Sequence, residues 1–130
     1  TRSYSSAASD VYKRQVIGCG GGRDMKKRKK MGLIAVNHSS FSVFTSDNPR
    51  DENPEKIIED MISGIDTIQL KKVFIELNRE IAIKLALSMI DEKCIVLIAG
   101  KGHENYQIIK SKKIEFNDSH VVKKSLKIAV

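Results

Sequence analysis

The chain of 130 residues contains no tryptophan, only two prolines and two cysteines, and 5% aromatic residues. Cys19 and Cys94 lie far apart without the spacing of a metal site, which indicates structural thiols in a reduced, cytoplasmic setting. No apolar run approaches the length that spans a bilayer, and no signal-peptide pattern is present. We therefore expect a cytoplasmic protein with no membrane partner.

Lysine dominates the charged residues and gives the chain a net charge of +7, as is typical of proteins that bind nucleic acid or acidic surfaces. Much of the excess lies in the basic run 26–30 and in Lys110, Lys112 and Lys113. No aromatic residue is interleaved with this run, as a base-stacking surface would require. We interpret the run as a solvated helix face with one or two phosphate contacts and expect no nucleic-acid partner. A basic nucleic-acid-binding module remains an alternative.

Three short apolar segments each end in a polar loop that contains glycine or proline. The segments are 16–17, 41–45 and 95–99, and their loops are 18–24, 46–50 and 100–104. Short apolar runs rich in β-branched residues are typical of buried parallel strands. Because ligands of open α/β sheets bind beyond the carboxyl ends of the strands, we expect the three loops to converge on one site.

The charged residues of these loops suit a zwitterionic ligand. The guanidinium groups of Arg23 and Arg50 can grip carboxylates in bidentate fashion, and Glu104 can pair with an ammonium group. Lys101 adds a cation to the third loop. His103 adds a titratable donor, although such a histidine is more typical of a structural hydrogen-bonding role.

Each loop taken alone has a structural interpretation that is at least as good. Loop 18–23 carries Arg23 at the third glycine position of the dinucleotide fingerprint and lacks the P-loop ending, so a flexible strand-to-helix turn competes with anion binding. Residues 47–50 alone are typical of a turn. It is the recurrence of three such loops that favours a binding site.

The remaining pattern predicts one α/β domain: a Rossmann-like, mostly parallel sheet flanked by helices, with a C-terminal hairpin and helix. Hydrophobic spacing predicts helices over 25–37, from Pro54 to Gly64, and over 79–90 with Asn78 as N-cap. A short strand is expected at 73–75, a hairpin at 106–109 and 113–116, and a last helix capped by Asp118 or Ser119. With 41% hydrophobic residues, the chain can bury a usable core.

Residues 1–15 differ from the rest of the chain. They are rich in serine and alanine and lack periodicity, and residues 5–15 resemble translated sequencing-adaptor read-through. We expect residues 1–15 to be a non-native leader and residues 16–130 to be a domain truncated at its N-terminal side. An ordinary disordered tail is the alternative.

Three motifs together resemble the C-terminal domain of the Mur ligases: GCGGGRDMKKRKKMG, TSDNPR and AGKGHENYQI, in this order. The resemblance covers Val16 to roughly Leu126 and is strongest to the ligases that add the third residue of the peptidoglycan stem peptide. It implies a cytoplasmic enzyme that uses ATP and Mg²⁺ to activate the D-Glu carboxylate of UDP-MurNAc-L-Ala-D-Glu as an acyl phosphate. The amine of meso-diaminopimelate would then attack this acyl phosphate.

The same resemblance implies which residues hold the incoming amino acid. Those expected to contact meso-diaminopimelate are Arg23, Asp47, Asn48, Pro49, Arg50, Gly100 and Glu104. It also points Asp24, Lys27 and Arg28 toward ATP. Gly22 stands where many relatives have Asp, and Lys29 where many have Pro, which leaves the start of the helix looser and the ATP-facing side less well defined.

By the resemblance, the P-loop, a modified lysine and the Mg²⁺ ligands belong to a central domain that these 130 residues do not contain. We therefore expect no catalytic residue, no metal site and no ligase activity in this chain alone. A lysine-adding ligase of the same family is an alternative, disfavoured by Arg50 because lysine lacks the second carboxylate. A stand-alone small-molecule-binding module would use the same loops.

Overall fold

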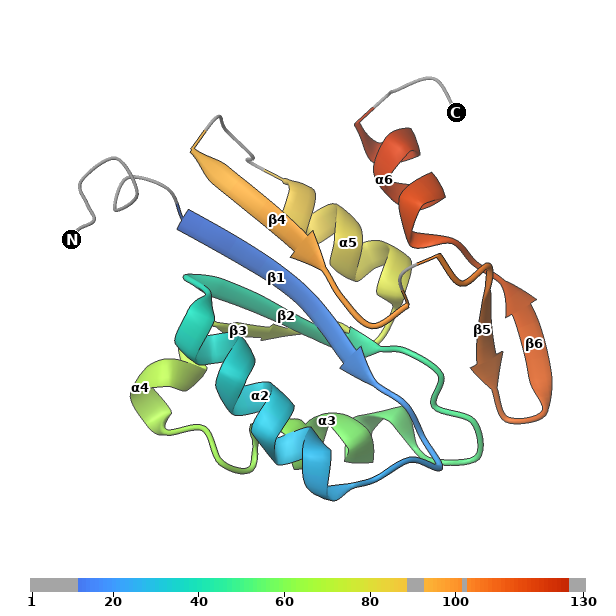
Figure 1. Ribbon diagram of the computed structural model, residues 1–130, viewed down its shortest axis with the longest axis horizontal. Coiled ribbons are helices and arrows are strands. Elements are labelled where there is room, and N and C mark those ends of the chain that lie inside the picture. The colour runs from blue at the N-terminus through green and yellow to red at the C-terminus, as the bar shows by residue number, and fades with distance from the viewer. Residues whose placement is uncertain (1–11, 89–92, 102, 127–130) are drawn as a thin grey trace.

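A computed structural model describes residues 12–88, 93–101 and 103–126 of the chain. Four parallel strands form a sheet in the order β3-β2-β1-β4 (Figure 1). The strands are β1 (Tyr12–Cys19), β2 (Phe41–Ser46), β3 (Val73–Ile75) and β4 (Cys94–Ile98). The chain winds outward from β1 to β3 and then crosses to β4 on the other side of β1, as in doubly wound sheets.

Helices cover both faces of the sheet, and a hairpin lies beyond its carboxyl edge (Figure 1). The helices are α2 (Lys26–His38), α3 (Pro54–Ile62), α4 (Thr67–Leu70), α5 (Arg79–Leu87) and α6 (Asp118–Ser125). The antiparallel hairpin consists of β5 (Tyr106–Ile109) and β6 (Lys112–Glu115). The α/β fold class predicted from the sequence is confirmed.

Successive side chains of a strand point to opposite faces of the sheet, and this divides the core into two layers. Ile17 and Phe44 pack with buried residues of α2 and α3, whereas Val16 and Val43 pack with α5. The register pairs Val16 with Val43 and Ile17 with Phe44, so paired residues of the two strands point into the same layer of the core. This arrangement fixes the height at which β1 and β2 end and therefore where their loops begin.

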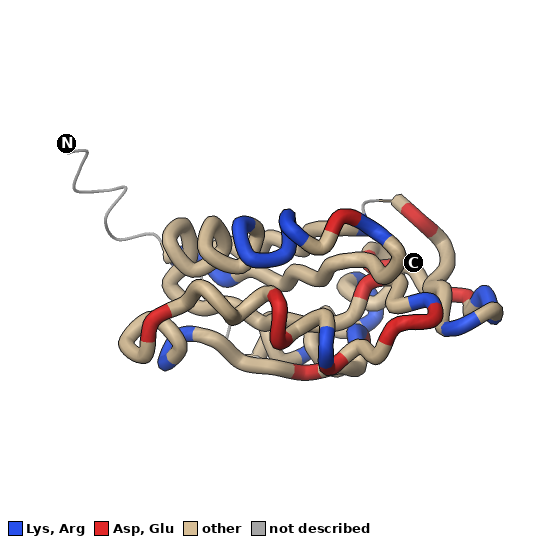
Figure 2. The backbone as a smooth tube through the Cα atoms, turned by 90° about the horizontal axis from the view of Figure 1, so that it is seen from below, with Lys and Arg blue, Asp and Glu red and all other residues tan. Residues whose placement is uncertain are grey.

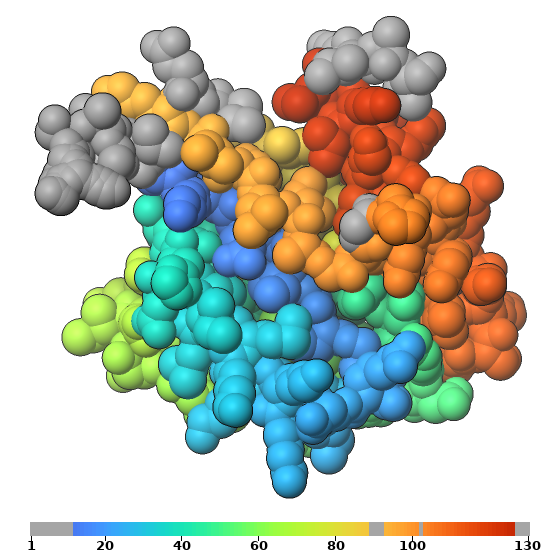
Figure 3. Space-filling view, in the orientation of Figure 1, coloured from blue at the N-terminus to red at the C-terminus, as the bar shows by residue number. Residues whose placement is uncertain are grey.

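In the part of the chain that the structure describes, no helix covers one strip of the sheet. Ile95 and Leu97 of β4 are 54% and 55% exposed, and side chains of β4 reach the surface in Figure 3. Their register partners on β1 are Lys13 and Gln15, which lie on the same face. Over the described ranges, no helix has the length and apolar character needed to cross a membrane.

The first strand begins earlier than the sequence pattern predicts. Tyr12 to Gln15 belong to β1 and pair with β4, and Arg14 Nη1 donates to the carbonyl oxygens of Ala86 (3.1 Å) and Ser88 (2.5 Å). The domain boundary expected at residue 16 therefore falls inside a strand. The side-chain pattern did not reveal the earlier start, because strand pairing uses backbone groups and imposes little on side-chain identity. Residues 1–11 lie outside the described residues, and a non-native origin for 1–15 stays a prediction.

Several helix details differ from expectation. Helix α5 ends at Leu87, while part of the expected extension, 89–90, lies outside the described residues. Asn78 caps α5 as predicted, but Asn117 rather than Asp118 or Ser119 caps α6, which leaves the Asp118 carboxylate available for Arg79. The pattern did not predict α4, a single turn with no buried residue.

The crossing of α2 over α3 depends on the absence of a side chain at Gly32, where a Cβ would lie 1.9 Å from the carbonyl oxygen of Met61. We expect Gly32→Ala to lower the free energy of unfolding by about 1–3 kcal/mol, despite a gain in helix propensity of about 1 kcal/mol. Gly64→Ala is the matched control, because its Cβ would meet the flexible end of Lys29. Equal denaturation midpoints for the two variants would contradict the close helix contact.

Candidate functional site

The three polar loops converge at the carboxyl edge of the sheet, as the sequence predicts. The amide of Gly21 donates to the carbonyl oxygen of Asn48 at 2.7 Å, and Arg50 Nη1 donates to the carbonyl oxygen of Gly21, also at 2.7 Å. Lys101 Nζ donates to Asn48 Oδ1 at 2.8 Å. Direct hydrogen bonds therefore join all three loops, because β1, β2 and β4 are neighbours that end at the same edge.

A pocket of about 280 Å³ opens between these loops. It is lined by Gly18, Cys19, Gly20, Arg23, Asp24, Lys27, Arg28, Met31, Asp47 and Gly100. All three polar loops and the start of α2 thus contribute to one cavity. Asn48, Pro49, Arg50 and Glu104 lie outside this lining.

Two arginines flank Gly20 at the mouth of this pocket. A Cβ at Gly20 would lie 3.1 Å from Arg50 Nη1 and 3.3 Å from Arg23 Cγ. Arg23 is exposed and has no hydrogen bond or ion pair in the described part of the chain. The arrangement places two guanidinium-bearing side chains close together at the edge of the pocket.

The loop at residues 47–50 packs directly against the glycine-rich loop. A Cβ at Gly21 would lie 1.9 Å from the carbonyl oxygen of Pro49, so the contact requires glycine. Asn48 and Pro49 are buried, and Asn48 Oδ1 accepts from both Lys101 Nζ and the Ile108 amide. These two residues hold the loop, whereas Asp47 faces the pocket.

The hairpin fixes the backbone of Arg50. Arg50 has φ of +53°, in the left-handed region that side chains seldom adopt. Its amide donates to the Ile108 carbonyl at 3.0 Å, and its carbonyl accepts from the Lys110 amide at 2.6 Å. Gln107 Nε2 also donates to the carbonyl oxygen of Asp47 at 2.7 Å. The hairpin therefore sets the direction in which the Arg50 side chain leaves the loop.

Arg28 is buried rather than solvated like the rest of the basic run, whose Lys and Arg positions are blue in Figure 2. Its guanidinium binds Glu52 at 2.8 Å, Asp60 at 2.9 Å and the carbonyl oxygen of Gly20 at 3.1 Å. The hydrogen bond from Arg28 lowers the pKa of Glu52, and Lys56 followed by Arg28 lowers the pKa of Asp60. Arg28 thus braces the glycine-rich loop, although it also lines the pocket.

The other two residues expected to face ATP lie at the start of α2. Asp24 Oδ1 accepts from the Lys26 amide at 3.0 Å and so stabilises the first turn of the helix. Lys27 is exposed and lines the pocket. In contrast, Cys19 is buried, and burial raises the pKa of its thiol to about 11, in agreement with a packing role.

In the third loop, Gly100 precedes Lys101 in the sequence and Glu104 follows it. Gly100 has φ of +114°, and a Cβ there would lie 3.6 Å from Asp47 Oδ2, so the backbone passes close to that carboxylate. Glu104 Oε1 lies 3.5 Å from Lys101 Nζ. His103 is exposed, and nothing in the described residues brings it into the pocket.

Sequence analysis missed the buried ion pair behind the site. Arg79, which is 1% exposed, binds both oxygens of Asp118 at 2.8 Å. It also donates to the carbonyl oxygens of Ser46 at 3.2 Å and Ala99 at 3.0 Å. One side chain therefore holds the ends of β2 and β4 together where their loops begin.

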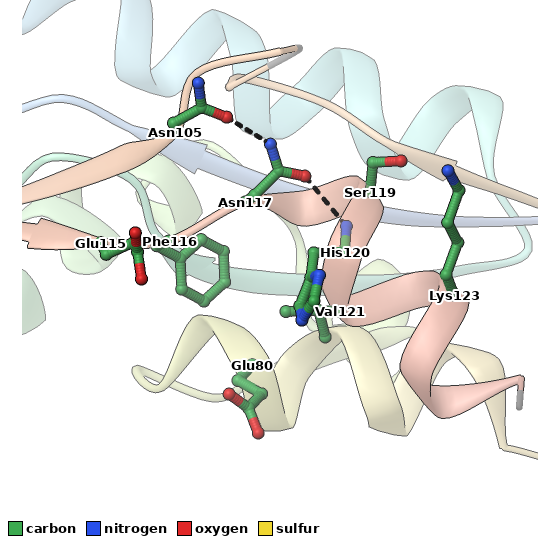
Figure 4. Close-up of a pocket in the computed structure, with 9 residues that line it drawn as sticks. All are labelled: Glu80, Asn105, Glu115, Phe116, Asn117, Ser119, His120, Val121 and Lys123. Atoms are coloured by element: carbon green, nitrogen blue, oxygen red, sulfur yellow. Dashed lines mark hydrogen bonds between the residues drawn. The ribbon is translucent and has the colours of Figure 1, made fainter. Parts of the chain in front are cut away.

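A larger cavity, about 740 Å³, lies elsewhere, between α5, α6 and the hairpin (Figure 4). None of the residues predicted for the site lines it. Asn105 and Asn117 are hydrogen-bonded to each other at its upper edge, and Glu80 lies across from them on α5 (Figure 4). Among the described residues, no group of three or more His, Cys, Asp or Glu side chains could hold a metal ion.

An α/β sheet whose polar loops enclose a pocket at its carboxyl edge defines a Rossmann-like ligand-binding domain. Comparison with known proteins gives the family: the chain belongs to the Mur ligases, since the model for "Mur ligase, glutamate ligase domain" matches residues 2–102.

The chain is similar to enzymes named UDP-N-acetylmuramoyl-L-alanyl-D-glutamate--2,6-diaminopimelate ligase. It is 52% identical over 111 residues to that of Aquifex aeolicus (strain VF5), covering 85% of this chain and 23% of the relative. It is 48% identical over 121 residues to that of Geobacillus kaustophilus (strain HTA426), covering 93% and 24%. A solved structure of a ligase of this name superposes with a TM-score of 0.83 at 39% identity, covering 89% and 24%. The chain thus spans about a quarter of the length of these relatives.

The Arg28 cluster predicts an acid-sensitive contribution to stability. Because Glu52 and Asp60 have lowered pKa values when folded, their contribution is complete above the ordinary carboxyl pKa of about 4 and is lost as the pH falls through the lowered values. We expect Arg28→Met to lower the free energy of unfolding at neutral pH by about 2 kcal/mol and to flatten this acid dependence. Urea titrations of the 130-residue chain at several pH values would measure both. Lys30→Met, on the exposed side of the same helix, should retain the wild-type pH dependence; identical curves for all three proteins would contradict the role of Arg28.

Proposed function

We propose that this chain is the amino-acid-binding domain of a cytoplasmic, ATP-dependent ligase that adds meso-diaminopimelate to UDP-MurNAc-L-Ala-D-Glu during peptidoglycan synthesis. The observation that carries the proposal is the gathering of Arg23 and Arg50 beside Gly20, with Asp47 on the same pocket. The names of the similar ligases agree with this ligand.

The charges of the site match those of meso-diaminopimelate, which carries two carboxylates and two amino groups. Arg23 and Arg50 supply donors for carboxylates, and guanidinium groups bind carboxylates in bidentate fashion. Asp47 and Glu104 supply acceptors for an ammonium group. Asn48, Pro49 and Gly100 contribute by holding these side chains and by letting the backbone approach the ligand.

The same charges favour diaminopimelate over lysine as the amino acid. Lysine has a single carboxylate, so one of the two guanidinium groups would face it without a partner. The bidentate contact that lysine cannot make would be lost, so the site should bind diaminopimelate more tightly than lysine. We therefore keep the lysine-adding ligase as the second candidate, to be tested directly.

In this proposal the domain orients the amino acid so that one amine can attack the activated D-Glu carboxylate. Holding both ends of the ligand reduces the entropic cost of bringing the amine to the acyl group. ATP, when bound, supplies the phosphoryl group that activates the carboxylate. The domain contributes binding and orientation, and the chemistry takes place at its edge.

Among the described residues, no group of three or more His, Cys, Asp or Glu side chains could hold a metal ion, and the sequence has no P-loop motif. In this proposal Mg²⁺ and the phosphates of ATP are bound mainly by a separate central domain. We propose that Asp24 and Lys27 face ATP from the start of α2, with Lys27 as the exposed cation. Because Arg28 is occupied by Glu52 and Asp60, its part in nucleotide binding would be indirect.

We expect the 130-residue chain to have no ligase activity on its own, because the groups that bind the phosphates and Mg²⁺ are proposed to lie in another domain. Incubation with ATP, Mg²⁺, meso-diaminopimelate and UDP-MurNAc-L-Ala-D-Glu should yield no UDP-MurNAc-tripeptide by mass spectrometry. A longer protein that contains this domain and a P-loop domain should yield it. ATP- and diaminopimelate-dependent product from the short chain would contradict the proposal.

Arg50 provides the sharpest test of ligand identity in such a complete ligase. We expect Arg50→Ala to raise the KM for meso-diaminopimelate by about 100-fold, as for loss of a bidentate carboxylate contact, with the KM for ATP nearly unchanged. Preference for diaminopimelate over lysine should fall in parallel. Arg50→Lys keeps the charge but loses the planar fork, so it should restore only part of the affinity. An unchanged KM would remove Arg50 from the site, and a wild-type enzyme that prefers lysine would replace diaminopimelate by the second candidate.

A further inference from the structure

A buried ammonium group lies between the two acidic side chains of the site. Lys101 is 3% exposed, although it belongs to a surface loop. Its Nζ donates to Asn48 Oδ1 at 2.8 Å and to the Tyr106 carbonyl oxygen at 2.9 Å. The same nitrogen lies 2.9 Å from Asp47 Oδ1 and 3.5 Å from Glu104 Oε1. The Lys101 ammonium group thus contacts the loop at residues 46–50 and the carboxylates of Asp47 and Glu104.

The two carboxylate oxygens depend on this ammonium. Asp47 Oδ1 and Glu104 Oε1 are buried, and the described residues offer neither of them a hydrogen-bond donor in good geometry. Lys101 is therefore the positive charge that compensates them. A buried carboxylate without a compensating charge is unfavourable, so both side chains are drawn toward Nζ.

The ammonium also determines which oxygen of each carboxylate is left free of the protein. With Asp47 Oδ1 turned toward Nζ, Oδ2 lies on the side of Gly100, a residue that lines the pocket. With Glu104 Oε1 bound at Lys101, Oε2 is the oxygen left for a ligand. The two inner oxygens are occupied by the protein, and the two outer ones remain for an ammonium group.

We propose that Lys101 is a positioning residue that orients Asp47 and Glu104 to receive an amino group of the ligand. The inference rests on the proposed function, because it assigns the two carboxylates to the ligand's amino group. In this proposal the Lys101 ammonium contacts only oxygens of the protein and makes no contact with the ligand.

The backbone of the site has supports other than Lys101. Arg79 ties the ends of β2 and β4, and the Gly21 amide and the hairpin hold the loop at residues 47–50 through their own hydrogen bonds. Loss of the ammonium should therefore disturb the two carboxylates more than the fold. If Lys101 had only a structural role, its removal would instead change the KM values for all substrates.

The test uses a complete ligase that carries this domain, assayed first with meso-diaminopimelate and with L-lysine to establish which amino acid it uses. We expect Lys101→Met to raise the KM for that amino acid by about tenfold or more, as for loss of one partner of a buried charge pair. The KM values for ATP and for the UDP-linked substrate should stay within about twofold. Lys101→Arg keeps the charge in a different shape and should give a smaller increase.

Lys113→Met is the matched control, because Lys113 Nζ lies 4.4 Å from the Tyr106 ring centre, near Lys101, but is exposed and has no ion pair with either carboxylate. It should retain wild-type KM values. If Lys101→Met does not fold, Lys101→Gln, which keeps a hydrogen-bond donor but loses the charge, carries the test, and an unchanged amino-acid KM in that variant overturns the inference.

The outcomes separate this inference from the proposed function. A wild-type enzyme that uses lysine contradicts the proposed substrate, yet a selective rise in the KM for lysine in Lys101→Met still supports the positioning role. An unchanged amino-acid KM in Lys101→Met, or equal increases for all three substrates, overturns the positioning role while the proposed function stands. An enzyme that uses neither amino acid overturns both.

Discussion

The geometry of the site depends on one buried guanidinium. Arg79 is almost fully removed from solvent, and a buried charge is tolerated only when it is fully paired. Its partners are the Asp118 carboxylate and the carbonyl groups of Ser46 and Ala99, which stand where β2 and β4 end. Because the binding loops start at these carbonyls, the distance between the loops follows from Arg79. The α6 helix that carries Asp118 is thereby linked to the site without touching the pocket.

Basic residues in this chain divide into those that support the site and those left free for a ligand. Arg28, Arg79 and Lys101 are each buried, and each is neutralised by carboxylates of the chain itself. Arg23 is exposed and unpaired among the described residues, and Arg50 commits only Nη1 to backbone carbonyls. The net positive charge of the sequence therefore overstates what the site offers to an anion. Of the two arginines left for a ligand, Arg50 is the one that the fold holds in place, through the carbonyl oxygens of Gly21 and Asn48.

The sequence predicted the meeting of the loops but not how they are held. Parallel neighbours must end at one edge, so three strand-to-loop transitions were enough to predict convergence. Arg28 was assigned to the solvated face, yet it begins the buried stripe that continues through Gly32, Ala35 and Val36. Arg79 likewise begins the stripe of Ala82, Ile83 and Ala86. A basic residue at the start of an apolar helix face was the signal in the sequence that Arg28 and Arg79 are buried. Their acidic partners come from distant segments and could not be predicted from spacing.

The strained conformation of Arg50 shows that the site and the hairpin form together. A non-glycine residue in the left-handed region costs about 1 kcal/mol or more and persists only where neighbours impose it. Here the Ile108 carbonyl and the Lys110 amide impose it, while a two-stranded hairpin is marginal on its own and needs such attachments. Each part thus supplies the hydrogen bonds that the other lacks. The antiparallel end of the fold is therefore part of the binding site, because without it the Arg50 backbone would relax and its side chain would leave the pocket edge.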